Sequence, residues 1–174
     1  MSVLVNATEV KTLQGNFLQV REQAMFAEPQ ESKGVFYFVA DSLLRWEYTQ
    51  PASLGIIANG KNIRLLRQNG QTQNSNAYAL QAMVKMIMQT ITGNLTADNG
   101  QFVVEKETGD NETLLTLTPA KRGNRQMFTR MQICLDKTGV IAKYVRMWEK
   151  SGDCTTIRFS NLQLNKPVPA TLFQ

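Results

Sequence analysis

The chain is divided by tight-turn signals, and these constrain its fold more than any other feature. Asn-Gly pairs occur at 59–60, 69–70 and 99–100. This dipeptide is typical of β-hairpin loops, because both residues tolerate a positive φ. Further turns are predicted within 107–113, 135–140 and 149–155, and the segments between turns are rich in β-branched and aromatic residues. We therefore predict a long antiparallel meander with strands at 16–24, 33–40, 43–49, 53–59, 62–67, 101–107, 112–118, 127–135, 140–149 and 154–161.

Two segments depart from the strand pattern. In residues 75–95, apolar side chains recur at the spacing of an amphipathic helix, with Ser75 as the expected N-cap and Gly93 as the expected stop. A shorter N-terminal helix ending at Gly15 is expected from the spacing of Val3, Ala7, Val10 and Leu13.

The long helix lies in the middle of the chain, and its apolar stripe needs a sheet face to cover. The chain has 174 residues, 43% of them hydrophobic, with no repeat or linker. These features predict a single domain over residues 1–174. Its fold class is mainly β: an unclosed, or half, antiparallel β-barrel of about 10–11 strands, with helices covering an apolar concave face.

Strict alternation assigns the faces of several strands. In LLRWEYTQP (43–51), apolar side chains at 44, 46 and 48 alternate with charged or polar ones. A curved sheet roofed by a methionine-rich helix can hold a ligand cavity, although the same side chains could simply pack as an ordinary core. The predicted lipid-binding residues are Phe36, Phe38, Leu44, Trp46, Tyr48, Met83, Ile87, Met127, Met131, Val145 and Met147.

The sequence contains no recognisable set of catalytic residues. The chain has no histidine, which removes the commonest general base and the Ser–His and Cys–His pairs. No nucleophile-elbow or phosphate-binding motif is present, and Glu47 and Glu149 are expected to be isolated, solvated carboxylates. Cys134 and Cys154 lack metal-site spacing; they are expected two strands apart, as buried free thiols. We predict no enzyme activity, no cofactor and no metal.

Charge and hydropathy limit the classes of partner and the cellular compartments that can be expected. The net charge is +5, but no basic stripe with interleaved aromatic residues appears, so nucleic-acid binding is not expected. No apolar run approaches 18 residues. The opening MSVLVNATEVKTLQG lacks a basic start and a long apolar segment. We therefore expect either a cytosolic protein or a mature secreted protein whose export signal has been removed.

Residues 34–66, GVFYFVADSLLRWEYTQPASLGIIANGKNIRLL, resemble the signature hairpin of the outer-membrane lipoprotein carrier family, LolA. Further pieces that fit are LTP at 117–119, the segment 127–161 and the P-x-x-LF ending at 169–173. The resemblance spans nearly the whole chain, in order. Ala40 stands where carriers of this family have an arginine that ties the lid shut, so that latch does not carry over.

The resemblance implies a periplasmic chaperone of Gram-negative bacteria, with helices as a lid over an apolar cavity. Such carriers take a triacylated lipoprotein from an inner-membrane release complex, shield its acyl chains and pass it to an outer-membrane acceptor. A monomer is expected. Two alternatives remain open: a LolA-like binder of another lipid, such as a glycolipid or polyene-type product, and an interaction domain without lipid cargo.

Overall fold

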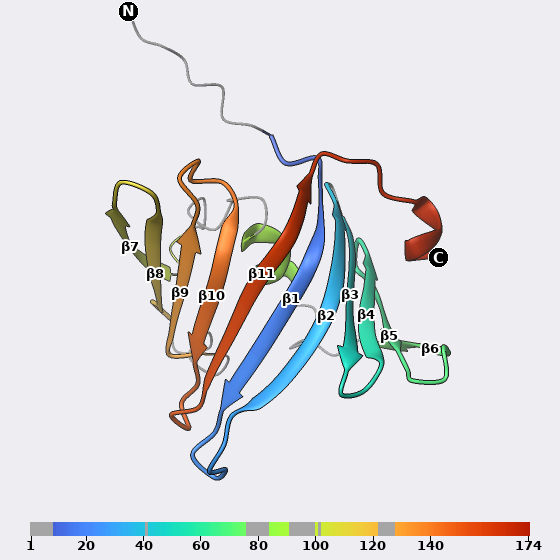
Figure 1. Ribbon diagram of the computed structural model, residues 1–174, viewed down its shortest axis with the longest axis horizontal. Helices are drawn as coiled ribbons and strands as arrows, with labels where there is room; N and C mark the ends of the chain where they lie inside the picture. Colours follow the sequence, from blue (N-terminus) through green and yellow to red (C-terminus); the bar gives the residue numbers. More distant parts are fainter. Residues whose placement is uncertain (1–8, 41, 76–83, 91–99, 101, 122–127) are drawn as a thin grey trace, which may run out of the picture.

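The computed structural model describes residues 9–40, 42–75, 84–90, 100, 102–121 and 128–174. These residues form one antiparallel sheet in the order β6-β5-β4-β3-β2-β1-β11-β10-β9-β8-β7 (Figure 1). The strands are β1 (Thr12–Glu22), β2 (Gln30–Val39), β3 (Leu43–Gln50), β4 (Leu54–Asn59), β5 (Asn62–Leu66), β6 (Thr72–Ser75), β7 (Phe102–Thr108), β8 (Thr113–Pro119), β9 (Arg130–Leu135), β10 (Ala142–Trp148) and β11 (Cys154–Leu164).

The first and last strands of the chain lie side by side at the middle of the sheet. From this β1–β11 seam, one meander runs outward through β2 to β6, and the other through β10 to β7. The two outer strands, β6 and β7, are not paired with each other, so the curved sheet stays open (Figure 1). The predicted unclosed, mainly β architecture is confirmed.

The turn chemistry predicted the hairpins well. Gly60 and Gly70 have φ of 60° and 78° and join β4 to β5 and β5 to β6. The short strand β6 was not predicted, because TQNS carries no apolar alternation. Its last residue, Ser75, ends this strand, and the residues that would begin the predicted helix after it lie outside the described part of the chain.

The expected N-terminal helix is wrong where the structure describes it. Leu13 and Gly15 lie in β1, and residues 1–8 are outside the described part of the chain. Gly15 does not end a helix; it occupies a register shift between Gln14 and Asn16, where a Cβ atom would approach the side chain of Leu162 to 2.7 Å. Pairing with β2 and β11 on both sides outweighs the weak helical spacing of this segment.

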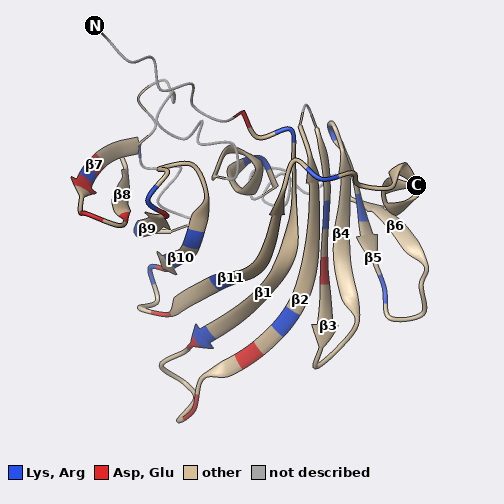
Figure 2. Cartoon of the chain, turned by 45° about the horizontal axis from the view of Figure 1, so that its top comes forward, with Lys and Arg blue, Asp and Glu red and all other residues tan. Residues whose placement is uncertain are grey.

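A helical segment at 84–90 covers the inner face of the sheet; it is the described part of the predicted helix 75–95. Figure 2 shows it within the curve of the sheet, and Val84 is buried in the same core cluster as Phe36 and Trp46. A second cluster lies under β8 to β10, and Phe159 packs against both clusters. None of the helices in the described ranges has both the length and the apolar character needed to cross a membrane.

The outer face of the sheet carries the C-terminal turn η3 (Ala170–Phe173). Arg45 on β3 donates from Nη1 to the carbonyl oxygen of Leu172 at 3.0 Å, and Arg64 on β5 donates from Nη2 to that of Phe173 at 2.7 Å. Ile57 lies between these arginines in the register and is buried on the same face. Arg45 therefore lies on the face opposite Leu44, Trp46 and Tyr48, as the alternation in 43–51 predicts.

Both cysteines are buried free thiols, as predicted. Cys134 lies on β9 and Cys154 at the start of β11, with β10 between them. Burial is the main cause that raises the pKa of each thiol, so both stay protonated at neutral pH.

Candidate functional site: an apolar cavity with one polar end

A cavity of about 270 Å³ lies on the inner face of the sheet, against the helical segment 84–90. Its walls come from strands on both sides of the β1–β11 seam, so only the bend of the sheet brings them together. The lining residues are Leu13, Gln19, Arg21, Phe36, Trp46, Tyr48, Ile56, Met86, Ile87, Thr90, Met131, Ala142, Val145, Met147, Glu149, Thr155, Ile157, Phe159 and Leu162.

One wall is a cluster of aromatic rings. Trp46 stacks on Phe17 with ring centroids 4.0 Å apart, and Phe36 meets Phe159 edge-on at 5.5 Å. Tyr48 meets Phe17 edge-on at 5.2 Å. Such offset and edge contacts hold the rings in fixed orientations, so this wall is rigid.

The other wall is rich in methionine, whose side chains are flexible. Met131 and Met147 lie on β9 and β10, Met86 on the helical segment, and Val145 and Ile157 complete this side. Methionine side chains are unbranched and polarizable, so they adapt to apolar ligands of different shapes. A rigid aromatic wall facing an adaptable methionine wall suits a hydrocarbon chain.

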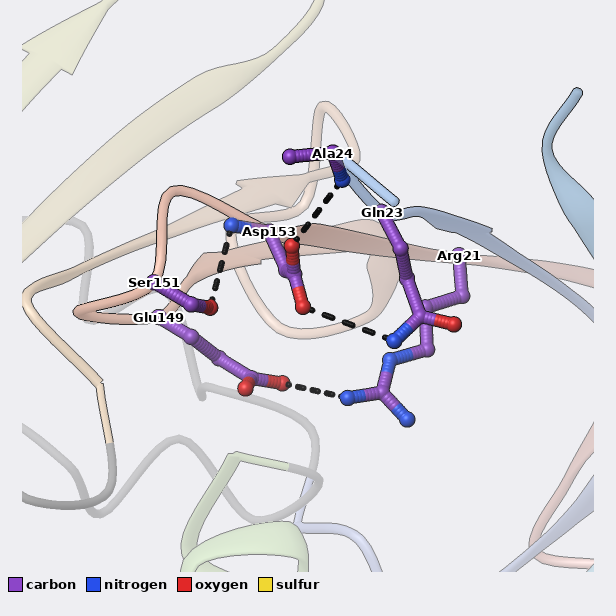
Figure 3. A network of polar contacts seen from close by, with 6 residues as sticks. All are labelled: Arg21, Gln23, Ala24, Glu149, Ser151 and Asp153. Carbon is purple, nitrogen blue, oxygen red and sulfur yellow. Dashed lines mark hydrogen bonds and ion pairs between the residues drawn. The ribbon is translucent and has the colours of Figure 1, made fainter. Parts of the chain in front are cut away.

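Polar residues gather at one end of the cavity. Arg21 on β1 donates from Nη2 to Glu149 Oε1 at 3.3 Å (Figure 3), and Thr155 lies opposite Arg21 in the register of β11. Nearby, the Tyr48 hydroxyl donates to Gln19 Oε1 at 2.8 Å. Burial raises the pKa of Tyr48, so its hydroxyl stays neutral and remains a donor.

A second set of contacts fixes the rim beside this polar end. The Asp153 carboxylate accepts from the backbone N–H of Ala24 at 3.2 Å and from Gln23 Nε2 at 3.4 Å (Figure 3). The Ala24 bond is the main cause that lowers the pKa of Asp153, so this carboxyl is ionised at neutral pH. These contacts tie the turn after β10 to the loop after β1, and they hold Arg21 and Glu149 side by side.

The predicted lipid-binding residues divide into three groups. Phe38 and Leu44 have the predicted parity but are fully packed in the core cluster rather than at the cavity. Met83 and Met127 lie outside the described residues. The structure brings the other seven together around the cavity: Phe36, Trp46, Tyr48, Ile87, Met131, Val145 and Met147.

Sequence reasoning missed the polar end. Glu149 was expected to be isolated, yet it pairs with Arg21 and lines the cavity. Gln19 and Arg21 share the parity of Phe17, which could have linked them. The alternation in β1 favours the opposite face as the buried one, however, because Leu18 and Val20 on that face are both apolar whereas Gln19 and Arg21 are polar.

The part of the chain that the structure describes contains no set of metal ligands. No three His, Cys, Asp or Glu side chains gather there at metal-binding distance.

An open curved sheet with an apolar cavity under a helical segment defines a protein of the ligand-binding class.

The chain belongs to the outer membrane lipoprotein carrier protein LolA family, whose model matches residues 8–174. It is 23% identical over 173 residues to an outer-membrane lipoprotein carrier protein of Dechloromonas aromatica, covering 94% of this chain and 76% of that protein. A carrier of the same description from Methylococcus capsulatus is 23% identical over 164 residues, with the same coverage. The family match indicates a binding protein and points to no catalytic family.

The fold also resembles solved structures. An uncharacterized conserved protein from Thermus thermophilus superposes with a TM-score of 0.58 at 11% identity, covering 95% of this chain and 85% of that one. At this identity the likeness concerns the fold alone.

Proposed function

We propose that the protein is a periplasmic carrier that shields the acyl chains of lipoproteins in its cavity. In this proposal it moves them from an inner-membrane release complex to an outer-membrane acceptor. The observation that carries the proposal is the cavity of about 270 Å³, walled by aromatic and methionine side chains, in a chain of the LolA family. The seven predicted residues that line it are the proposed acyl-binding residues.

The energetics of this task match the site. Each methylene removed from water contributes about 0.8 kcal/mol, so an acyl chain does not cross an aqueous compartment unshielded. A carrier must nevertheless release its cargo without covalent chemistry. An adaptable wall beside an open sheet supports both demands, because the ligand can be held by burial alone.

A second candidate is a LolA-like binder of another lipid with a single chain, such as a glycolipid or polyene-type product. The cavity volume favours this candidate, because about 270 Å³ is just below the roughly 300–1,000 Å³ range of small-ligand sites and suits one chain better than three. Ala40 also favours it: the residue at the family's arginine position packs against the core cluster and offers no latch.

Native mass spectrometry of gently purified protein tests these functions directly. Co-purified acylated peptide supports the lipoprotein carrier, and free lipid supports the second candidate. If neither is bound, and no fluorescent acyl ester binds to the purified protein, both proposals fail.

The Arg45→Ala variant is expected to bind a fluorescent acyl ester within about twofold of the wild type. Arg45 is on the outer face, where it pairs with Glu47 at 2.9 Å and holds the C-terminal turn. Its loss should instead speed amide hydrogen exchange in residues 170–174. A large loss of ester affinity in this variant would contradict the assignment of inner and outer faces.

A further inference from the structure

On the strands that line the cavity, polar side chains lie at one end only, and the gradient is the same on neighbouring strands. Along the inner face of β1, Phe17 is followed by Gln19 and then Arg21. The register pairs Phe17 with Phe159 and Arg21 with Thr155, so β11 repeats the change from apolar to polar. Phe17 and Arg21 are four residues apart, or about 13 Å along the strand. A ligand that fits this gradient is an amphiphile lying in one orientation.

The other strands repeat this order. On β3, Trp46 precedes Tyr48, whose hydroxyl reaches Gln19. On β10 and the turn after it, Val145 and Met147 precede Glu149. The hydrocarbon end of the ligand therefore belongs among the aromatic rings, and its polar group belongs beside Arg21.

Arg21 has hydrogen-bonding capacity left for that group. Its Nη2 is used by Glu149, but its Nε is buried and has no acceptor among the described residues. A buried N–H without an acceptor is unfavourable, so a ligand oxygen placed there is stabilised. Thr155, opposite Arg21 in the register, also lines this end of the cavity.

The charges around Arg21 decide which oxygen fits. Glu149 already neutralises the guanidinium, and the ionised Asp153 lies on the same rim (Figure 3). An incoming carboxylate would therefore meet the Glu149 carboxylate already paired with Arg21, and like charges repel. An uncharged ester or amide carbonyl accepts the same hydrogen bond without that repulsion.

We propose that Arg21 binds the uncharged carbonyl of an acyl ester or amide, and that Glu149 selects against free fatty-acid anions. This inference rests on the proposed lipid-binding function and deepens it, because it names the ligand class. The headgroup would be held by Arg21 and Thr155 at the rim, with the chain directed toward Phe17 and Trp46.

The test compares methyl dodecanoate with dodecanoate, which share one chain, by displacement of a fluorescent acyl ester at neutral pH. The ester is less water-soluble than dodecanoate, so the wild type would bind it more tightly whatever Arg21 and Glu149 do. The test therefore depends on how each affinity changes from the wild type to the variants. Glu149→Gln is expected to raise dodecanoate affinity about tenfold and to leave ester affinity within about twofold. Arg21→Gln is expected to weaken the ester about fivefold or more.

Glu22→Gln is the matched control for Glu149→Gln. Glu22 is an exposed carboxylate at the end of β1, next to Arg21, and it does not line the cavity. It should change neither affinity. If Glu149→Gln shifts the two affinities no more than Glu22→Gln does, or if Arg21→Gln leaves ester binding intact, the inference is overturned while lipid binding stands. If the wild type binds neither ligand, the proposed function fails and the inference fails with it.

Discussion

Replacing Ile157 with tryptophan is expected to weaken acyl-ester binding on the order of a hundredfold. Ile157 lies on the inner face of β11, paired with Gln19 on one side and Val145 on the other, and it lines the cavity. An indole at this position fills space that a ligand would otherwise use. Excluding about four methylenes at about 0.8 kcal/mol each removes about 3 kcal/mol of binding free energy.

Ser160→Trp is the matched control for this substitution. Ser160 is a neutral, exposed residue of the same strand, outside the cavity lining. Both variants should unfold within a few degrees of the wild type, because one indole enters empty space and the other enters solvent. Affinities are measured by displacement of the fluorescent ester. Equal affinities in the two folded variants would mean that the ligand binds elsewhere.

Gly34→Ala is expected to destabilise the fold by about 4 kcal/mol and to lower the melting temperature by roughly 10 °C. A Cβ atom at Gly34 would lie 2.6 Å from Phe17 Cε1 and closer still to the carbonyl oxygen of Glu47. Phe17 cannot move aside, because it stacks on Trp46 at a centroid distance of 4.0 Å. The strand itself would have to shift, which close-packed interiors resist.

Gly109→Ala separates this steric effect from the general effect of removing a glycine. The nearest atom to a Cβ at Gly109 is the Glu112 carbonyl oxygen at 3.5 Å, an ordinary contact. This control should stay within about 1 kcal/mol of the wild type in chemical denaturation. Similar unfolding free energies for the two alanine variants would show that Phe17 does not pack over Gly34 as described.

Local chemistry predicted most of the strands and hairpins. A positive φ is a property of one or two residues, so Asn-Gly pairs report a turn whatever surrounds them. The inner face of β3 was equally clear, because Leu44, Trp46 and Tyr48 alternate with polar residues and a one-residue slip would bury Arg45. Six of the seven predicted ligand-binding residues that line the cavity lie on strands and follow from the same alternation, and Ile87 follows from the helical spacing.

Packing against distant strands decided what local pattern could not. Whether an inward-facing residue lines the cavity or fills the core depends on the bend of the sheet, and this bend separates Trp46 from Leu44 and Phe38. Neither residue type nor parity carries that information.

Turn residues and alternation alone specify an open antiparallel meander with an apolar inner face, because both are local properties of the chain. Which face of β1 looks inward depends instead on packing across the whole sheet. Leu18 and Val20 are as apolar as Phe17, but the register shift at Gly15 and pairing with two strands turn Phe17, Gln19 and Arg21 toward the cavity. Arg21 then meets Glu149, 128 residues away along the chain. Such a pairing arises only when strands from the two ends of the chain join at one seam.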